Sequence, residues 1–445
     1  MNSFTTKTVV RVALAGCLLG NVWAQTSDAL LDTLIRKGVL TEAEAKAIQA
    51  DAAKEGPRTP KLESKADSKQ FKFSGDFRLR YDGIYDSLGV VDRNRLRYRL
   101  RAGLTYTFHD DWEIGMRLAT GDAGSNPLSA NQSFGGNGSK KGVTIDTAYV
   151  KWSRAINDDF SLKFTGGKMN TPFVFTEMLF DHDYTPEGFA QQFVYKLNPD
   201  HALKLTVGEF VLNELPGSSQ DPYLGVAQLR FDSQWNPRWK TSIGVAALAI
   251  AGKNSLPTPP APAGVPTIPD ITKGNARTAA GLLVHNYNPF VIDGAITYML
   301  GQMPLYPGAF PITLSGEYMN NPAAAHSPNG HQAYNIALTL GKAGQRGQWD
   351  VSYRWKRLEG DAWYEELVDD DFGAVYRTAS LNNGVASLSY GGGTNVRGQI
   401  LRASYSPLDA LTLSVTYFLT DLVHPSPMGA ASGAQRILVD AMWKF

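Results

Sequence analysis

From Gln70 to its end, the chain alternates between apolar and polar residues. The first such segment places an apolar residue or a glycine at every second position, at Phe71, Phe73, Gly75, Phe77, Leu79 and Tyr81. The same period of two recurs over residues 96–108, 112–118, 148–152, 160–164, 193–197, 203–207, 227–231, 336–340, 349–355, 400–405, 411–419 and 437–445. Repeated alternation indicates β-strands whose two faces meet different surroundings, so the chain is predicted to be all-β from residue 70 onward.

The connections between these segments are short and long in turn. Short turns with Asn, Asp or Pro lie at residues 109–111, 157–159, 198–200, 236–237 and 406–409, and long Gly, Ser and Pro-rich segments cover 121–142, 169–188, 252–274, 320–331 and 359–395. This order is typical of a transmembrane antiparallel β-barrel with periplasmic turns and extracellular loops. We expect about sixteen strands, or eighteen, because both ends of such a barrel are periplasmic. Residues 275–302 are the hardest to assign, since Pro289 interrupts them.

Composition does not separate a barrel from a soluble protein, because lumen-facing polar residues lower the average hydropathy of each strand. Hydrophobic residues make up 43% of the chain and the mean hydropathy is −0.23. Aromatic residues gather beside the short turns, where a membrane barrel carries an interfacial girdle: Phe108, Trp112, Trp152, Phe160, Trp235 and Trp239. The formal net charge of +1 gives no reason to expect a nucleic acid partner.

Residues 1–24 are predicted to be an export signal. Lys7 and Arg11 precede an apolar run over residues 12–20, and Ala24 ends a small-residue cleavage site. A lipoprotein processing box ending at Cys17 is the alternative, but it leaves too short an apolar core. Cleavage after Ala24 removes Cys17, the only cysteine, so the mature chain has no disulfide or thiol chemistry.

Residues 25–69 are predicted to form a periplasmic helical segment and linker ahead of the barrel at 70–445. An apolar stripe over residues 29–35 and a capping box over residues 41–44 indicate two helices, and prolines follow in residues 56–68. Two interpretations stay open for this segment. It is either a plain helical hairpin or an extension that self-associates or contacts the cell wall.

The last strand ends on an aromatic residue. Ile437, Val439, Ala441, Trp443 and Phe445 share one face. Such an end resembles the signal that the outer-membrane assembly machinery reads, so Trp443 and Phe445 are predicted to serve as an assembly signal.

Five arginines occupy every second position of one strand: Arg93, Arg95, Arg97, Arg99 and Arg101. At a rise of about 3.3 Å per residue this ladder spans on the order of 27 Å, close to the height of the apolar band of a barrel. Each arginine facing lipid near the midplane would cost about 2–4 kcal/mol, so the ladder is predicted to face the lumen. Arg78, Arg80 and Arg117 on neighbouring strands extend it.

Two interpretations of the ladder stay open. Lumen arginines attract anions, and their guanidinium groups suit carboxylate and phosphate oxygens. Alternatively, they only pair with carboxylates such as Asp76 and Asp82 and stiffen the wall.

The third long loop carries Glu177, Asp181, Asp183 and Glu187. If this loop folds inward, its carboxylates would face the arginines across the narrowest point of the pore and orient dipolar solutes. The alternative is an extracellular loop that is solvated or binds calcium weakly. Asp369, Asp370 and Asp371, in a later loop, are predicted to form a solvated or ion-bridging surface.

The sequence contains no Gly-x-Ser-x-Gly element and no His-Glu-x-x-His zinc site, and its seven histidines fall mostly in turns and loops. We therefore expect no enzyme, no cofactor and no metal site. Two functions remain. A porin would have an open lumen, whereas a structural or adhesive barrel would have a blocked one.

Several segments resemble the putative porin family of Gram-negative outer membranes, which is related to the phosphate-selective porins O and P. The resemblance lies in residues 30–44, 71–81, 167–188, 306–318 and 360–364. It implies an outer-membrane homotrimer with an inward-folded third loop, surrounded by lipid and lipopolysaccharide, through which small solutes pass. It does not identify the solute.

Overall fold

The computed structural model describes residues 70–86, 93–109, 111–121, 128–217, 220–256, 274–278, 281–373, 393–424 and 433–445. The predicted export signal and helical segment lie outside the described residues. None of the helices found within these ranges is long and apolar enough to cross a membrane.

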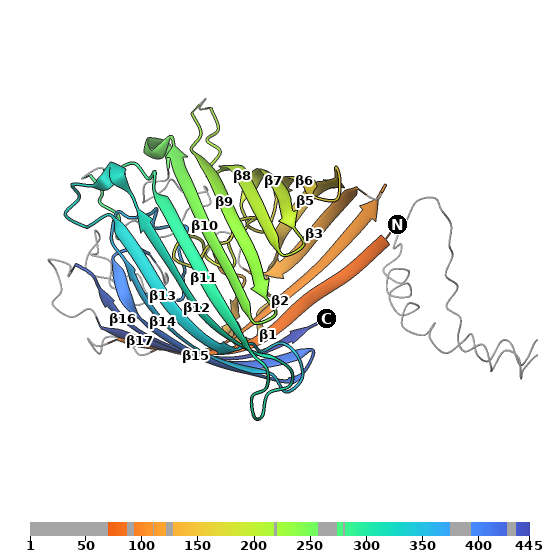
Figure 1. The fold of residues 1–445 in the computed structure, drawn as a ribbon. Coiled ribbons are helices and arrows are strands. Elements are labelled where there is room, and N and C mark those ends of the chain that lie inside the picture. Colours follow the sequence, from red (N-terminus) through yellow and green to blue (C-terminus); the bar gives the residue numbers. More distant parts are fainter. Residues whose placement is uncertain are drawn as a thin grey trace, which may run out of the picture. The chain divides into compact units, whose positions relative to one another are not determined.

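The described part of the chain contains sixteen long strands (Figure 1). They are β1 (Gln70–Asp86), β2 (Arg93–Phe108), β3 (Trp112–Thr120), β5 (Val143–Ala155), β6 (Phe160–Lys168), β7 (Glu187–Asn198), β8 (His201–Val211), β9 (Tyr223–Asn236), β10 (Trp239–Ala251), β11 (Phe290–Leu300), β12 (Phe310–Asn320), β13 (Gln332–Gly341), β14 (Trp349–Leu358), β15 (Val396–Leu408), β16 (Leu411–Leu422) and β17 (Ala434–Lys444). A two-residue strand, β4 (Gln132–Ser133), pairs with β2 at Arg97 and Tyr98. Three short 3-10 helices lie in loops: η1 (Gly136–Gly138), η2 (Lys253–Ser255) and η3 (Pro322–Ala324).

The sixteen long strands form a closed antiparallel barrel. Each pairs with the next one along the chain, and β17 pairs with β1 over Asp76–Asp86. The predicted fold and the count of sixteen are confirmed. Pro289 ends the preceding loop and β11 begins at the next residue, because proline cannot donate to the sheet ladder.

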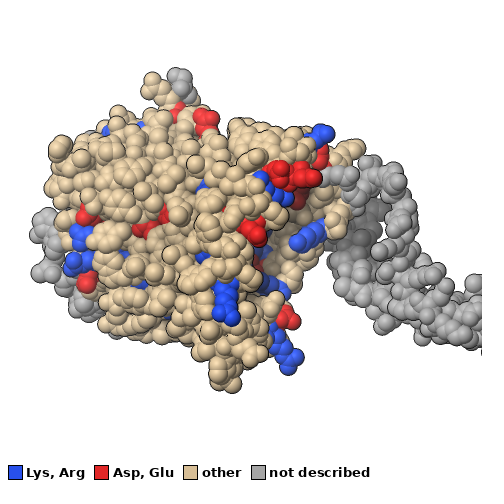
Figure 2. All heavy atoms as spheres, viewed as in Figure 1, with Lys and Arg blue, Asp and Glu red and all other residues tan. Residues whose placement is uncertain are grey.

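The outer face of the barrel is apolar. Leu79, Leu96, Ile243 and Val415 are among the exposed large hydrophobic side chains on alternate positions of their strands. Figure 2 shows a face of the molecule on which charged side chains gather in only a few places. A contiguous hydrophobic surface of this kind is unfavourable in water. It therefore indicates that lipid surrounds the barrel.

Strand β10 departs from the expected alternation. Leu248 and Ile250 point inward, yet both are apolar and buried. They pack with Leu224 of β9 and with Met178 from the loop after β6 in one apolar cluster. The strand is apolar on both faces because one face meets lipid and the other meets a segment of the chain inside the barrel.

Candidate pore constriction

The arginines of β2 face the carboxylates of β1 in register. Arg101 lies opposite Asp76, and Arg95 lies opposite Asp82. Asp82 is fully buried and accepts hydrogen bonds from Arg95 at 2.9 Å and from Arg436 of β17 at 2.9 Å. Arg97 donates to the same carboxylate at 3.3 Å. Three strands are thus joined at one buried carboxylate.

Asp183 brings the loop after β6 to this wall. The Arg99 guanidinium donates to Asp76 and to Asp183, both at 3.0 Å. Arg101 lies 2.8 Å from Asp76 and 3.4 Å from Asp183. These arginines hold the pKa of the Asp183 carboxyl below its usual value despite its burial. Two arginines of the ladder therefore bind one wall carboxylate and one loop carboxylate.

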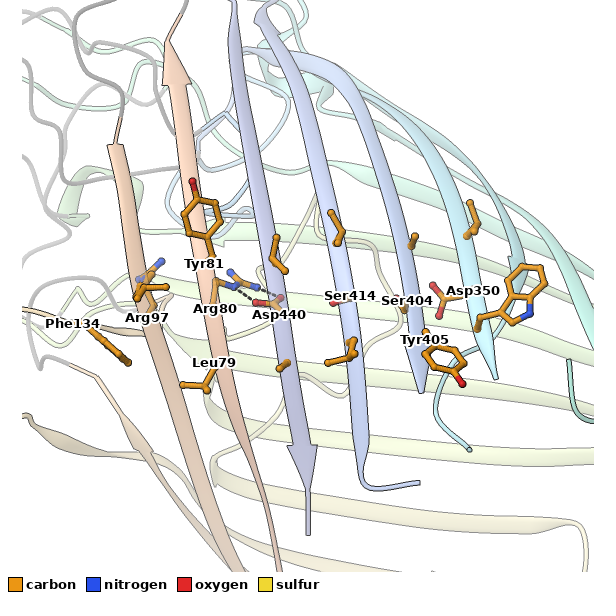
Figure 3. A pocket seen from close by; sticks show the side chains of 18 residues that line it. Leu79, Arg80, Tyr81, Arg97, Phe134, Asp350, Ser404, Tyr405, Ser414 and Asp440 are labelled. Atoms are coloured by element: carbon orange, nitrogen blue, oxygen red, sulfur yellow. Dashed lines mark hydrogen bonds and ion pairs between the residues drawn. The ribbon is translucent and has the colours of Figure 1, made fainter. Parts of the chain in front are cut away.

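Arg80 pairs with its neighbour on the other side. Its guanidinium donates to Asp440 of β17 at 2.7 Å, and Figure 3 shows this pair on adjacent strands. It also donates to Asp371 at 3.1 Å. Arg78, by contrast, donates to the Asn131 amide oxygen at 2.6 Å and has no ion pair among the described residues.

Arg117 and Arg93 stand at the edges of the ladder. Arg117 of β3 pairs with Asp146 and donates to Asn170 of the loop after β6 at 2.7 Å. Arg93 opens β2 and is half-buried. Ion pairs with carboxylates, which the wall-pairing interpretation expects, are present at six of these arginines: Arg80, Arg95, Arg97, Arg99, Arg101 and Arg117.

The loop of residues 169–186 crosses the lumen to the opposite strands. Backbone N–H of Thr176 donates to Glu317 of β12 at 3.0 Å, and the Gln228 amide of β9 donates to the Val174 carbonyl at 2.7 Å. Glu177 pairs with Arg354 of β14, whose charge keeps the pKa of this buried glutamate well below its usual value. This segment, named the inner loop from here on, spans from β2 to β14.

Of the four predicted loop carboxylates, Glu177, Asp181 and Asp183 lie in the inner loop, but Glu187 does not. Glu187 begins β7, where its side chain is 65% exposed and lies 3.0 Å from the Lys168 ammonium. Its register neighbour Val211 is exposed on the outer face. The prediction was wrong for Glu187, because the strand starts two residues before the expected end of the loop and its alternation turns this side chain outward.

A second segment, residues 359–373, also folds against the inner loop. Trp363 is fully buried and its indole N–H donates to the Leu179 carbonyl at 3.0 Å. The Asp370 backbone N–H donates to the Asp181 carboxylate at 3.0 Å. Asp369, Asp370 and Asp371 were predicted to form a solvated or ion-bridging surface. The structure places them against the inner loop instead, and Asp371 bridges Arg80 and Arg436 there. We call residues 359–373 the docking segment.

Asp181, Asp369 and Asp370 have carboxylate oxygens within 4.8 Å of one another, which makes them the group best placed to hold a cation among the described residues. Burial and the neighbouring Asp371 raise the pKa of Asp370 to about 8. Burial, followed by the charges of Asp370 and Asp183, raises the pKa of Asp181 well above its usual value. The backbone N–H groups of Asp183 and Asp370 donate to the Asp181 carboxylate at 2.6 and 3.0 Å.

A cavity of about 620 Å³ lies between the ladder, the two inner segments and β13–β17. Its basic lining residues are Arg78, Arg80, Arg99, Arg101, Arg354, Arg402 and Lys444, and its acidic ones are Asp76, Glu177, Asp183, Asp369, Asp371 and Asp440. Arg402 and Lys444 are exposed and make no ion pair within the described ranges. The cavity is polar, water-accessible and slightly richer in basic than in acidic groups.

Sequence reasoning did not find the docking segment or Arg402. One signal for the inner segments was present. Residues 243–251 are apolar almost throughout. A strand with one face in water would carry polar residues at every second position, so this run indicates that both faces are covered. For Arg402 there was no local signal, since a single lumen arginine differs from the paired ones only by its surroundings.

Residues 89–267 match the model of a family described as putative porins. The structure is similar to Pseudomonas putida OprB, with a TM-score of 0.50 and 11% identity over 84% of this chain and 94% of that one. It is also similar to the outer-membrane channel DcaP of Acinetobacter baumannii, with a TM-score of 0.43 and 12% identity over 85% of this chain and 97% of that one. No curated protein matches the chain. The match to the putative porin model over residues 89–267 and the closed sixteen-stranded barrel show a porin-like β-barrel channel of a Gram-negative outer membrane.

Proposed function

We propose that this porin passes small hydrophilic solutes by diffusion and prefers anions. The observation that carries the proposal is a surplus of unpaired cations in the lumen. Arg402 and Lys444 line the cavity, and Lys163, Lys204 and Lys240 stand on β6, β8 and β10. Within the described part of the chain none of the five has a carboxylate partner. Unpaired lumen cations attract anions and repel cations.

In this proposal the inner loop is the constriction, with Glu177, Asp181 and Asp183 on one side and the arginine ladder on the other. The paired arginines fix the loop to the wall, and the unpaired cations set the charge preference. A blocked structural or adhesive barrel is disfavoured by the cavity beside the loop.

The proposal extends to biogenesis. Residues 1–24 direct export, and residues 25–69 remain in the periplasm. Outer-membrane assembly machinery reads Trp443 and Phe445, and the barrel then lies as a homotrimer among lipid and lipopolysaccharide. The hydrogen bonds of Phe445 at the barrel seam support a role for this residue in closure.

The test is single-channel conductance in a planar bilayer, with the reversal potential measured under a potassium chloride gradient. We expect an anion-preferring reversal potential that moves toward zero in a Lys163→Gln, Lys204→Gln, Lys240→Gln variant. A triple change at Arg95, Arg97 and Arg99 is less informative, because it also frees Asp76 and Asp82 from their partners. A cation-preferring wild type would overturn the proposal.

A further inference from the structure

The wall of the cavity formed by β14–β16 differs in chemistry from the arginine ladder. Arg80, Arg99 and Arg101 are each committed to two carboxylates. Arg402 of β15 lines the same cavity, is exposed, and makes no hydrogen bond or ion pair with any described residue. It is therefore a guanidinium whose donors are available to a solute.

Hydroxyl groups surround Arg402 on both neighbouring strands. Ser352 of β14 and Thr416 of β16 lie directly opposite Arg402 in the sheet register. Neighbouring strands are about 4.8 Å apart, so both hydroxyl groups lie beside the stem of the arginine. Neither side chain is hydrogen-bonded to another described residue. The next pair toward the short turns is Ser404 and Ser414, which Figure 3 shows on adjacent strands.

Carboxylates are missing from this part of the wall. Residues 400–406 and 412–418 include no Asp or Glu. The nearest acidic residue on β14 is Asp350, which accepts a hydrogen bond from the Ala343 backbone N–H at 3.0 Å. Ser404 is 5% exposed and its Oγ has no partner. This wall therefore presents hydrogen-bond donors, the guanidinium and the hydroxyl groups, with no carboxylate on residues 400–406 or 412–418 to accept from them.

We propose that Arg402, Ser352 and Thr416 form a binding subsite for the carboxylate of a small permeating monoanion. The inference rests on the proposed anion-preferring channel and names the class of solute that it holds. A guanidinium presents a planar fork that matches the two oxygens of a carboxylate, and two hydroxyl groups add donors at the sides. Chloride is a single acceptor and gains little from the fork. Among the three subsite residues only Arg402 is charged, so the subsite balances one negative charge and fits a monocarboxylate better than a divalent anion.

The test is the dependence of single-channel conductance on salt concentration, in potassium acetate, potassium chloride and potassium sulfate. Binding at a subsite makes the current saturate. We expect saturation in acetate at a concentration several-fold lower than in chloride. Arg402→Gln should raise the half-saturating acetate concentration several-fold. Arg402→Lys, which keeps the charge but loses the fork, should raise it nearly as much, and a Ser352→Ala, Thr416→Val variant should raise it to a smaller degree.

Arg397→Gln is the matched control, because Arg397 lies on the same strand but on the opposite face, with Arg357 and Asp421 as its register neighbours. Its acetate curve should equal that of the wild type, and all variants should keep the mobility of a folded barrel. An acetate curve that Arg402→Gln leaves unchanged overturns the subsite, even when the channel prefers anions. Stronger saturation in sulfate than in acetate overturns the monocarboxylate class. A channel without anion preference contradicts the proposed function instead.

Discussion

Phe445, the last residue of the sequence, is joined to Gly75 on the first strand by two backbone hydrogen bonds. The Gly75 N–H donates to the Phe445 carbonyl at 2.8 Å, and the Phe445 N–H donates back to the Gly75 carbonyl at 3.1 Å. The phenyl ring covers the glycine, where a Cβ would lie 2.6 Å from the ring and 2.3 Å from the Arg101 carbonyl oxygen. The end of the chain thus continues the seam between β1 and β17, at a position where only glycine fits.

Gly75→Ala should destabilise the barrel. The added methyl group must displace backbone or the phenyl ring, and such overpacking costs about 1–3 kcal/mol. The measurement is the urea midpoint of unfolding, followed by the heat-dependent mobility of the barrel in detergent gels. Gly301→Ala is the control, since a Cβ there meets nothing within 4 Å. Equal midpoints for the two variants would show that the phenyl ring does not restrict residue 75.

Asp183→Asn should increase anion preference. The change removes a negative charge that Arg99 and Arg101 share and leaves Asp76 as their remaining carboxylate. One unit charge at 4 Å is worth about 1 kcal/mol in water, so the ratio of anion to cation permeability should rise on the order of two- to five-fold. The reversal potential under a salt gradient gives this ratio. Glu187→Gln, on the outer rim, should leave it unchanged, and an equal effect of both variants would contradict the placement of Asp183.

Trp363→Ala should loosen the docking segment without opening the barrel. The indole is fully buried and bonded to Leu179 of the inner loop. Truncating a buried tryptophan costs about 3–5 kcal/mol, which would be lost from the packing of these two segments. We expect larger and noisier single-channel conductance with an intact barrel. Trp235→Ala, at an exposed position on the outer face, is the control. An unchanged conductance would mean that the docking segment does not narrow the pore.

The docking segment should be held more firmly at pH 5 than at pH 9. The pKa of Asp370 is raised to about 8 by burial and by Asp371, so the folded state binds a proton that the unfolded segment releases near its ordinary pKa of about 3.9. Its contribution to stability is full below that ordinary value and is lost as the pH rises through about 8. The raised pKa of Asp181 acts in the same direction. Hydrogen exchange of residues 359–373 should therefore rise between pH 5 and pH 9, after correction for the intrinsic rate.

Asp370→Asn should remove most of this pH dependence, because the amide carries no charge at either pH. The wild type and the variant should then differ at pH 9 and agree at pH 5. A variant that loosens at pH 9 as much as the wild type would assign the effect to another group. On acidification below the ordinary aspartate range, the ion pair of Asp371 with Arg436 should weaken, since the pKa of Asp371 is lowered by that arginine.

The sequence by itself determined the barrel. A period of two is a local property, because successive side chains of a strand point to opposite faces, and lipid on one face and water on the other impose a separate composition on each. The strand count, the order of short and long connections, and the inward direction of Arg93–Arg101 all followed from it. Where the pattern failed, in β10, a segment of the chain inside the lumen had replaced water.

Only the tertiary structure decided which charges are neutralised. Asp183 and Asp371 are 84 and 291 residues away in sequence from Arg99 and Arg80, the arginines that they pair with. No local pattern connects residues at such separations, because their meeting depends on how two long loops pack inside a closed sheet. Arg402 looks like any other lumen arginine in the sequence. Arg402 differs in that it forms no ion pair with a carboxylate of the described residues. The reason is that the loops that carry carboxylates pack against the opposite wall.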